Sequence, residues 1–280
     1  MNLKDLVAGI KAETKAEASA SATLKKIIDD YLLTDAFRDY LATHREDAPK
    51  YLPEQGDPPG RFRASSAGKC LQQQCFKAVA KLGVGVEVQK IIRPAKNARA
   101  LLNGTFSHVR WHMIFDALHE RKLVETLAFE VRSYSEQLQL TGAFDRLVRF
   151  PYGPRIITML IDFKTIKSYG FANLTGAQPD HAAQQHAYEL LNAYGADKWT
   201  MLMEDKDTQD IKIFEADYDQ ELFDTLRKQY AIGNKWVDEA VEKKTVLNLD
   251  TVLPLKTDWC SWCDYQAICK KVQRAIKSEI

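Results

Sequence analysis

Two aspartates and a lysine in neighbouring segments are arranged as in a metal-dependent hydrolytic site. Asp145 ends the apolar alternation of TGAFDRLVRF, while Asp162 and Lys164 are two positions apart in LIDFKTIK and so share one side of a strand. Burying these charges in an apolar strand costs several kcal/mol unless each has a partner. A Mg²⁺ or Mn²⁺ ion between the aspartates would supply one, and Lys164 can then orient or deprotonate a water or stabilise charge on phosphorus. The alternative is a structural Asp–Lys pair at a sheet edge.

The five cysteines form a second candidate metal site. Three of them, Cys260, Cys263 and Cys269, have the spacing C-x2-C-x5-C, and either Cys70 or Cys75 can supply a fourth thiolate. Four thiolates suit zinc or an iron–sulfur cluster, and the spacing does not choose between them. Because the number is odd and the chain is long, a disulfide framework is not expected. Buried free thiols are the remaining alternative.

The elements that must position these residues follow from hydrophobic periodicity and chain breakers. Helical periodicity covers 3–46, and the Pro/Gly-rich stretch 48–60 ends an N-terminal helical extension, 1–60. The pattern of the remaining chain predicts an α/β domain with a mixed central sheet. The expected helices are one that begins near Ser65 or Ser66 and contains Cys70 and Cys75, and others at 97–121, 178–194 and 218–243. The expected strands are 127–133, 140–150, 155–165 and a pair within 199–216.

In this context, Gly142-x-x-Asp145 followed by Asp162-x-Lys164 resembles the core of the PD-(D/E)XK nucleases, in particular their RecB-like branch. Three further features match that branch in order along the chain. They are His108 four residues after Gly104, Glu130 before the G-x-x-D strand, and Gln184-x3-Tyr188 after the lysine. The resemblance covers about 61–271 and implies a restriction-endonuclease-like core in the domain 61–280, with a mixed central sheet flanked by helices and a C-terminal Cys-rich region.

The resemblance also implies roles for these residues. His108, Asp145, Asp162 and the main-chain carbonyl of Phe163 would bind one or two Mg²⁺ or Mn²⁺ ions, with Glu130 as a possible additional acidic member. Lys164 would help to activate the attacking water. Gln184 and Tyr188, which share a helix face, would position the substrate. The implied activity is a metal-dependent deoxyribonuclease, with exonuclease action on single-stranded or end-containing DNA as the expectation. Its setting would be DNA processing, repair, recombination, or phage or CRISPR-type DNA metabolism.

The cysteines fit the same resemblance. Some RecB-like nucleases, including AddB nuclease domains and CRISPR-associated RecB-like exonucleases, bind a [4Fe–4S] cluster through one early cysteine and a late C-x2-C-x5-C. This implies the ligand set Cys70, Cys260, Cys263 and Cys269, with zinc as the alternative metal. Cys70 is favoured over Cys75 because the preceding SSAGK resembles the serine-containing helix start of the family.

Charge is distributed unevenly along the chain, although the net charge is only +1. The segment 61–122 carries 12 Lys/Arg and 3 Asp/Glu, whereas 1–60 carries 8 and 11. A segment this basic fits a surface that faces phosphates, and Arg61, Arg63 and Lys69 are the expected DNA-backbone contacts. A solvated basic face balanced by acidic neighbours is the alternative.

Two further interpretations remain open. The chain can be a DNA-binding assembly factor whose N-terminal helices dock a helicase, a recombinase or another protein, with little or no cleavage. It can also be a zinc-ribbon protein in which D-x-K is incidental. His108 and His112 have i, i+4 spacing, but Val109 occupies the position where a metalloprotease motif needs glutamate, so His112 is assigned to packing or to the surface.

Composition bounds the class of protein. The chain has 280 residues, of which 45% are hydrophobic and 28% charged, which excludes wholesale disorder and a collagen-like chain. No run of 18 apolar residues exists, so no transmembrane helix is expected, and the N-terminal residues lack the apolar core of a secretory signal. We therefore expect a cytoplasmic protein without a membrane partner. Its oligomeric state is not indicated.

Overall fold

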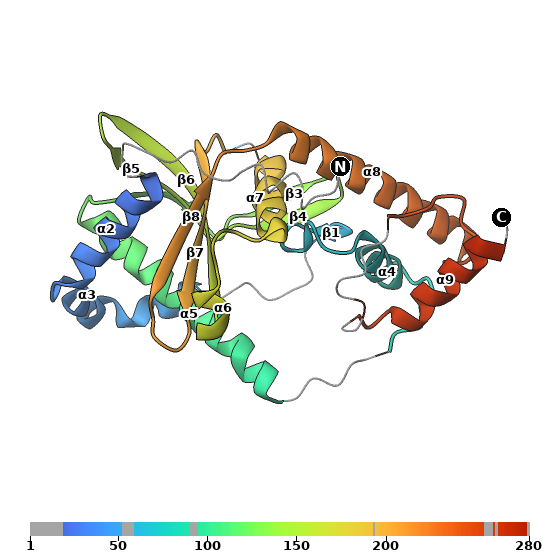
Figure 1. Ribbon diagram of the computed structural model, residues 1–280, viewed down its shortest axis with the longest axis horizontal. Helices are drawn as coiled ribbons and strands as arrows, with labels where there is room; N and C mark the ends of the chain where they lie inside the picture. The colour runs from blue at the N-terminus through green and yellow to red at the C-terminus, as the bar shows by residue number, and fades with distance from the viewer. Residues whose placement is uncertain are drawn as a thin grey trace.

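The computed structural model describes residues 19–51, 59–89, 95–192, 194–254, 260 and 263–278 (Figure 1). The first part of the helix expected at 3–46 lies outside these residues. The helices are α2 (Ala20–Leu32), α3 (Ala36–His44), α4 (Leu71–Lys81), α5 (Ala95–Glu120), α6 (Ser168–Ala172), α7 (Pro179–Asn192), α8 (Gln220–Lys243) and α9 (Gln266–Ser278), with short 3-10 helices η1 (Arg45–Tyr51) and η2 (Ala64–Ser66).

The strands form two sheets rather than the single sheet that the sequence predicts. They are β1 (Phe62–Arg63), β2 (Glu125–Phe129), β3 (Arg132–Ser135), β4 (Leu140–Ala143), β5 (Arg146–Tyr152), β6 (Arg155–Ile166), β7 (Lys198–Asp205) and β8 (Ile211–Ala216). The larger sheet has the order β2-β5-β6-β7-β8 and the smaller has the order β1-β4-β3. Each sheet contains one parallel pair, β6 with β7 and β1 with β4, so both are mixed. This is an α/β architecture consistent with a restriction-endonuclease-like core.

Helices cover both faces of the larger sheet, and a separate apolar core fills each side (Figure 1). One core joins α2, α3, η1 and α5 to the sheet, with Leu24, Ile28 and Phe115 fully buried. The other joins α4, α7 and α8 to the smaller sheet and to the opposite face of the larger one. The described part of 1–60 thus shares a core with α5. None of the described helices combines the length and hydropathy needed to cross a membrane.

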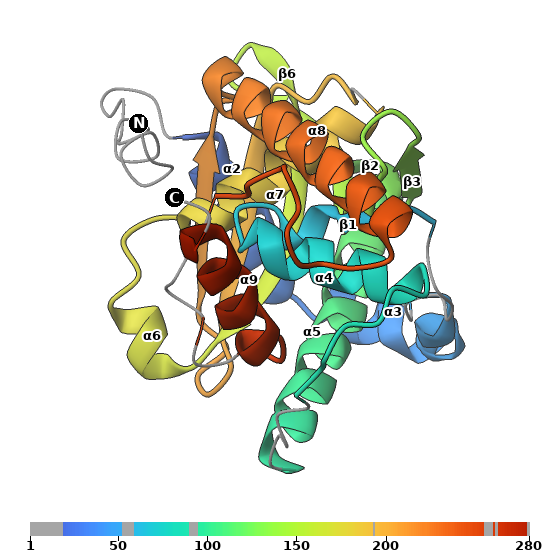
Figure 2. The ribbon, with the colours of Figure 1, turned by 90° about the vertical axis from the view of Figure 1, so that its right-hand side faces the viewer.

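The C-terminal helix lies beside α4 (Figure 2). Phe76 of α4 stacks on Tyr265, just before α9, with ring centroids 5.6 Å apart, and the N–H of Gln89 donates to the carbonyl of Asp264. These contacts bring the residues just before α9 beside α4 and the segment that follows it. The chain positions involved are nearly 200 apart, so this proximity is a product of the tertiary fold.

Candidate active site

The site lies where the chain crosses between the two sheets. The sequence predicts continuous strands over 127–133 and 140–150, but each breaks in the middle, at Glu130 and at Phe144–Asp145 respectively. Glu130 adopts a left-handed backbone with φ of +47°, and its N–H donates to the carbonyl of Asp145 at 3.3 Å. The two breaks are therefore side by side, and they place two carboxylates at one junction.

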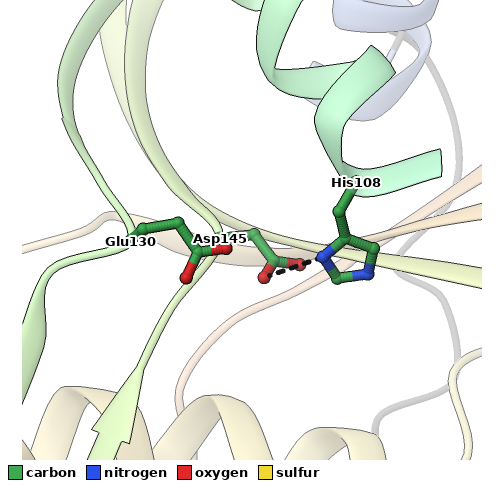
Figure 3. Close-up of side chains that lie close together, drawn as sticks. All are labelled: His108, Glu130 and Asp145. Atoms are coloured by element: carbon green, nitrogen blue, oxygen red, sulfur yellow. Dashed lines mark ion pairs between the residues drawn. The ribbon is translucent and has the colours of Figure 1, made fainter. Parts of the chain in front are cut away.

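One imidazole joins these carboxylates. The side chains of His108, Glu130 and Asp145 each present a ligand atom, and the three atoms lie within 4.8 Å of one another (Figure 3). Helix α5 supplies His108, whose Nδ1 is 3.4 Å from Oδ1 of Asp145. Carboxylate oxygens with one imidazole nitrogen form a donor set that suits Mg²⁺ or Mn²⁺, so these residues fit a divalent ion.

Asp162 and Lys164 complete the site from β6. Arg146 pairs with Ile161 across the antiparallel β5–β6 ladder, and one step further along the ladder Asp145 faces Asp162. Asp162 is buried with 1% of its surface exposed, and it forms an ion pair with Lys164. Lys164 keeps 28% of its side chain exposed, so its ammonium can reach both the aspartate and the solvent.

Burial and neighbouring charges shift the pKa values of the acidic residues in opposite directions. Burial raises the pKa of Asp162 to about 6, and the charge of Asp145 adds to this although Lys164 opposes it. Burial also acts to raise the pKa of Asp145, but His108, Lys164 and the N–H of Phe163 lower it to about 2. The Phe163 N–H donates to Oδ2 of Asp145 at 2.5 Å. Asp145 is therefore held as a carboxylate.

The two basic groups remain protonated when no metal is bound. Burial lowers the pKa of His108, but the charge of Asp145 and a hydrogen bond to it outweigh burial and raise the value to about 9. Burial similarly lowers the pKa of Lys164, whereas Asp162 and Asp145 raise it to a net value above the ordinary one. Lys164 is thus an ammonium that donates hydrogen bonds, rather than a general base.

The Gln184–Tyr188 pair contacts Asp162. Nε2 of Gln184 donates to Oδ1 of Asp162 at 2.9 Å and to the hydroxyl of Tyr188 at 2.6 Å. Both residues lie on α7 one helical turn apart, and both are buried. The sequence assigns both to substrate positioning; in the structure Gln184 contacts Asp162 directly, and Tyr188 contacts Gln184.

A groove of about 780 Å³ opens beside Lys164 and Gln184. All three cations expected to contact DNA line it, together with two further lysines of α4 that the sequence argument did not single out. These five are Arg61, Arg63, Lys69, Lys77 and Lys81. No acidic residue is among the described lining residues. Burial and the nearby ammonium groups of Lys164 and Lys77 lower the pKa of Lys69, although acidic neighbours oppose this shift. The described lining of the groove therefore has the charge that suits a polyanion.

The cysteines lie apart from this site. Cys70 directly precedes α4, so it lies outside the helix in which the sequence prediction placed it. Cys75 lies inside α4 and is buried, with its thiol directed to the carbonyl of Gly233. Burial raises the pKa of the Cys269 thiol, and the thiols of Cys70, Cys260 and Cys263 raise it further. Within the described residues, however, the sulfur atoms do not form a group within 4.8 Å of one another. An iron–sulfur cluster is therefore not shown.

Two buried residues behind the site were given no functional role in the sequence analysis. His112, assigned there to packing or to the surface, is fully buried and contacts Glu130, and Arg146 is fully buried behind it. Arg146, Val148 and Phe150 share one face of β5, and the latter two are in the apolar core. An arginine on the apolar face of a strand is the signal that could have identified Arg146.

A comparison with protein-family models identifies a family for most of this chain. The family model described as PD-(D/E)XK nuclease superfamily matches residues 64–270. A comparison with curated proteins gave no significant match.

A search of solved structures gave matches at low sequence identity. One is described as SSO0001 (14% identity, 84% of this chain and 93% of that chain, TM-score 0.44). Another is LHK-Exo in complex with dAMP (14% identity, 66% and 91%, TM-score 0.47). A third is an alkaline exonuclease, LHK-Exo, from Laribacter hongkongensis (13% identity, 71% and 95%, TM-score 0.45).

Proposed function

The chain belongs to the PD-(D/E)XK nuclease superfamily, and we propose that it is a Mg²⁺- or Mn²⁺-dependent deoxyribonuclease that acts on single-stranded or end-containing DNA as an exonuclease. The observation that carries the proposal is the convergence of His108, Glu130 and Asp145 with the Asp162–Lys164 pair at the edge of an acid-free basic groove. A role in DNA repair, recombination or the DNA metabolism of phage or CRISPR systems would follow from this activity.

Each side chain has a distinct task in phosphodiester hydrolysis. His108, Asp145 and Asp162, with Glu130 and the carbonyl of Phe163, would hold the divalent ion. When bound, that ion supplies polarisation of the scissile phosphate and stabilisation of the leaving oxygen. The ammonium of Lys164 donates to the attacking water and to the phosphate oxygen on which charge develops. Gln184 holds Asp162 in place and lies in the wall of the groove, where its amide can also meet the substrate.

The groove residues would hold the DNA strand. Arg61, Arg63 and Lys69 contact backbone phosphates, which positions the strand without reading its sequence. Lys69 already donates to the carbonyl of Ser65 at 2.9 Å, so its ammonium is held at the groove wall rather than free to swing. A strand that follows these cations reaches Lys164 at the end of the groove.

The test uses variants that remove one catalytic group each. Asp162→Ala and Lys164→Ala should fold and bind DNA but fail to cut it. Lys26→Ala is the matched control, because Lys26 lies on the surface of α2 and forms an exposed ion pair with Asp30. End-labelled and circular DNA, single- and double-stranded, are incubated with Mg²⁺, Mn²⁺ or EDTA. Full cleavage by either catalytic variant would refute the assignment, and cleavage of circles would exclude a strict exonuclease.

We further propose a [4Fe–4S] cluster, with zinc as the alternative, on Cys70, Cys260, Cys263 and Cys269. The mutual effect of these thiols on the pKa of Cys269 supports it, as does the packing of α9 beside α4. A zinc ion with Zn–S bonds of about 2.3 Å holds its four sulfurs roughly 3.8 Å apart. The described cysteine sulfurs are farther apart, since no three of them lie within 4.8 Å of one another. The larger iron–sulfur core tolerates a wider arrangement.

A pair of cysteine variants tests this cluster. Cys70→Ala should lose the broad visible absorbance and the bound iron of protein purified without oxygen, because it removes a ligand. Cys75→Ala should keep both, since the Cys75 thiol faces Gly233 inside the core. Equal absorbance and iron in the Cys70 variant and the wild type would contradict the ligand assignment, and stoichiometric zinc without absorbance would identify the alternative metal.

Residues 1–60 are proposed as an extension docked on the nuclease domain 61–280, and as the place where a helicase or recombinase could attach. The described part of the extension turns its apolar residues Leu24 and Ile28 into the core of the sheet. Leu33, at the end of α2, is 86% exposed. A partner would therefore meet the outer side of these helices. Binding of a candidate partner should weaken in Leu33→Asp without loss of nuclease activity.

A further inference from the structure

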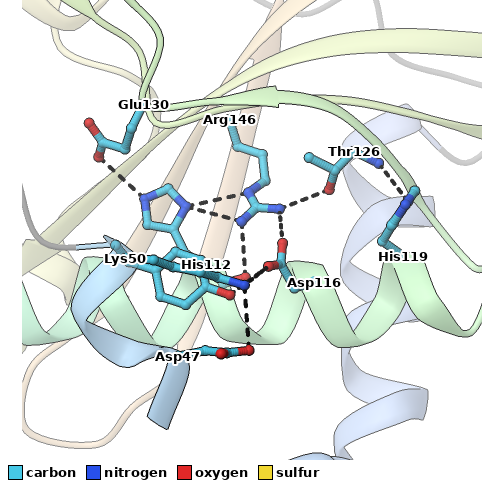
Figure 4. A network of polar contacts seen from close by, with 9 residues as sticks. Asp47, Lys50, His112, Asp116, His119, Thr126, Glu130 and Arg146 are labelled. Carbon is cyan, nitrogen blue, oxygen red and sulfur yellow. Dashed lines mark hydrogen bonds and ion pairs between the residues drawn. The ribbon is translucent and has the colours of Figure 1, made fainter. Parts of the chain in front are cut away.

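A chain of buried polar side chains ends on Glu130 (Figure 4). Nε2 of His112 is 3.3 Å from Oε1 of Glu130, and Nδ1 of the same ring is 3.4 Å from Nε and 3.3 Å from an Nη of Arg146. His112 and Arg146 are both fully buried, whereas Glu130 keeps 29% of its side chain exposed toward the site. This network of hydrogen bonds therefore runs from the interior of the protein to a carboxylate that is partly exposed to solvent.

The hydrogen-bond chemistry of Arg146 decides the tautomer of His112. A guanidinium has five N–H donors and no acceptor, so the Nδ1 atom that faces it must accept. The ring proton is then on Nε2, the nitrogen that faces Glu130. Glu130 accepts this hydrogen bond through Oε1, which leaves its other oxygen and its remaining lone pairs available to the group formed with His108 and Asp145.

Arg146 is itself held firmly. One Nη donates to Oδ1 of Asp116 at 2.7 Å and to the hydroxyl oxygen of Thr126 at 2.8 Å, and the other donates to the carbonyl of His112 at 3.0 Å. Asp116 is fixed in turn by the hydroxyl of Tyr51, at 2.5 Å. Arg146 is therefore held by contacts with α5, with β2 and, through Asp116, with η1. These contacts fix the guanidinium that faces the His112 ring.

The backbone of Glu130 shows that its placement is specific. A left-handed conformation at a residue that is not glycine is uncommon and persists only where the surroundings enforce it. Here the N–H of Glu130 bonds to the carbonyl of Asp145 and its side chain bonds to His112. Both contacts aim the carboxylate at the junction of the two sheets, where His108 and Asp145 lie.

We propose that His112 is a positioning residue for Glu130, that Arg146 holds the His112 ring in the tautomer that donates to this carboxylate, and that this contact orients Glu130 to bind the divalent ion. The inference deepens the proposed function and rests on it. Partners of metal-binding side chains orient the ligand and strengthen metal binding in this way. The sequence motif alone assigns no task to His112 or Arg146.

The experiment measures Mn²⁺ affinity of the full chain without DNA, by calorimetry, beside the rate of DNA cleavage. His112→Phe should weaken Mn²⁺ binding by about 10-fold, within the range usual for such partners, because it removes the donor and keeps the ring. His112→Gln should recover most of this loss, since its amide offers an acceptor to Arg146 and a donor to Glu130. His119→Phe is the control: His119 lies on the same face of α5 and accepts a hydrogen bond from the N–H of Thr126, and Glu130 is not among its described contacts.

A double-mutant cycle separates positioning from general damage to the fold. Glu130→Gln should weaken Mn²⁺ binding at least as much as His112→Phe, and adding His112→Phe to Glu130→Gln should then change little. An equal loss in both backgrounds would overturn the proposal, because it would mean that His112 acts without Glu130. Unchanged affinity in Glu130→Gln would overturn it as well.

One measurement needs no variant and is unaffected by misfolding. The ¹⁵N chemical shifts of the His112 ring in the wild-type protein should show a protonated Nε2 and an unprotonated Nδ1, and the opposite pattern would exclude the proposed tautomer. The outcomes also distinguish the proposed nuclease function from the positioning role of His112. Absence of any metal-dependent cleavage by the wild type refutes the proposed function, whereas normal cleavage with no coupling between His112 and Glu130 refutes only this inference.

Discussion

Lys164, His108 and Asp145 illustrate how neighbouring charges control the state of a buried site. Burial alone would favour the neutral form of each, but their mutual attraction favours the charged forms of all three. Asp162 is the exception, since burial and the nearby Asp145 raise its pKa. Without metal, the cations His108 and Lys164 therefore face Asp145 and Asp162. Of these two aspartates, Asp162 takes up a proton more readily.

This charge state predicts that metal affinity rises with pH. A divalent ion needs the lone pair of His108, whose pKa is about 9, so between pH 6 and pH 9 each ion bound must displace one proton. Below pH 6 the protonated Asp162 adds a second proton. The logarithm of Mn²⁺ affinity should thus increase by about one per pH unit from 6 to 9, more steeply below 6, and level off above 9.

Calorimetry in buffers of different ionisation enthalpy measures this proton release directly. His108→Gln serves as the comparison, because its amide carries no titratable proton and should abolish the dependence between pH 6 and pH 9. An affinity that is flat over that interval in the wild type would show that His108 does not bind the ion.

At the scale of elements, close packing of β4 on α7 and η2 holds the G-x-x-D segment in place. A Cβ added at Gly142 would lie 2.7 Å from Cβ of Ala64 and 3.1 Å from side-chain atoms of Leu191 and Tyr188. Glycine is therefore required at this position by its neighbours. Gly104, the other glycine of the motifs, has only an ordinary 3.9 Å contact with Thr165 and is not required sterically.

The second prediction follows from this difference. Gly142→Ala should lower the free energy of unfolding by about 1–3 kcal/mol, the usual cost of overpacking, and should reduce cleavage because the strand that leads to Asp145 must move. Gly85→Ala, where nothing lies within 4 Å of the added Cβ, is the control and should stay within about 0.5 kcal/mol of the wild type. Chemical denaturation provides the comparison, and equal stability of the two variants would contradict the packing argument.

Most elements could be predicted from local periodicity, and the differences are informative. The helices expected at 97–121, 178–194 and 218–243 correspond closely to α5, α7 and α8. The strands expected at 127–133 and 140–150 are wrong as continuous elements, because alternating polarity does not reveal a change of sheet. At Glu130 and Asp145 the chain leaves one sheet for the other, and hydrogen bonds between distant segments compensate for the break.

At the scale of the whole molecule, the basic groove is the proposed path by which a strand of DNA approaches the site. Five cations from the segment before the core and from α4 line it beside Lys164. Their effect on DNA is mainly electrostatic, since phosphate contacts release counterions and carry no sequence information. Lys77 and Lys81, one helical turn apart on α4, extend the path beyond the three cations that the sequence indicated.

The third prediction concerns salt dependence. The double variant Lys77→Gln, Lys81→Gln should bind DNA more weakly in EDTA at every sequence tested, and the slope of log affinity against log salt should fall by about 1–2. Lys26→Gln, outside the groove, should leave the slope unchanged. Fluorescence anisotropy with labelled oligonucleotides measures both quantities, and a slope equal to that of the wild type would exclude α4 from the DNA path.

The sequence alone determined the chemistry available to this protein. The order and spacing of His108, Glu130, Asp145, Asp162 and Lys164 indicated a PD-(D/E)XK nuclease, because residue types and strand or helix periodicity are local properties of the chain. Only the tertiary structure decided that Glu130 lies beside His108 and Asp145, that Arg146 and His112 lie behind it, and that α4 provides a wall of the groove. These relations join segments distant along the chain, and side-chain packing between elements, not local pattern, determines which of them meet.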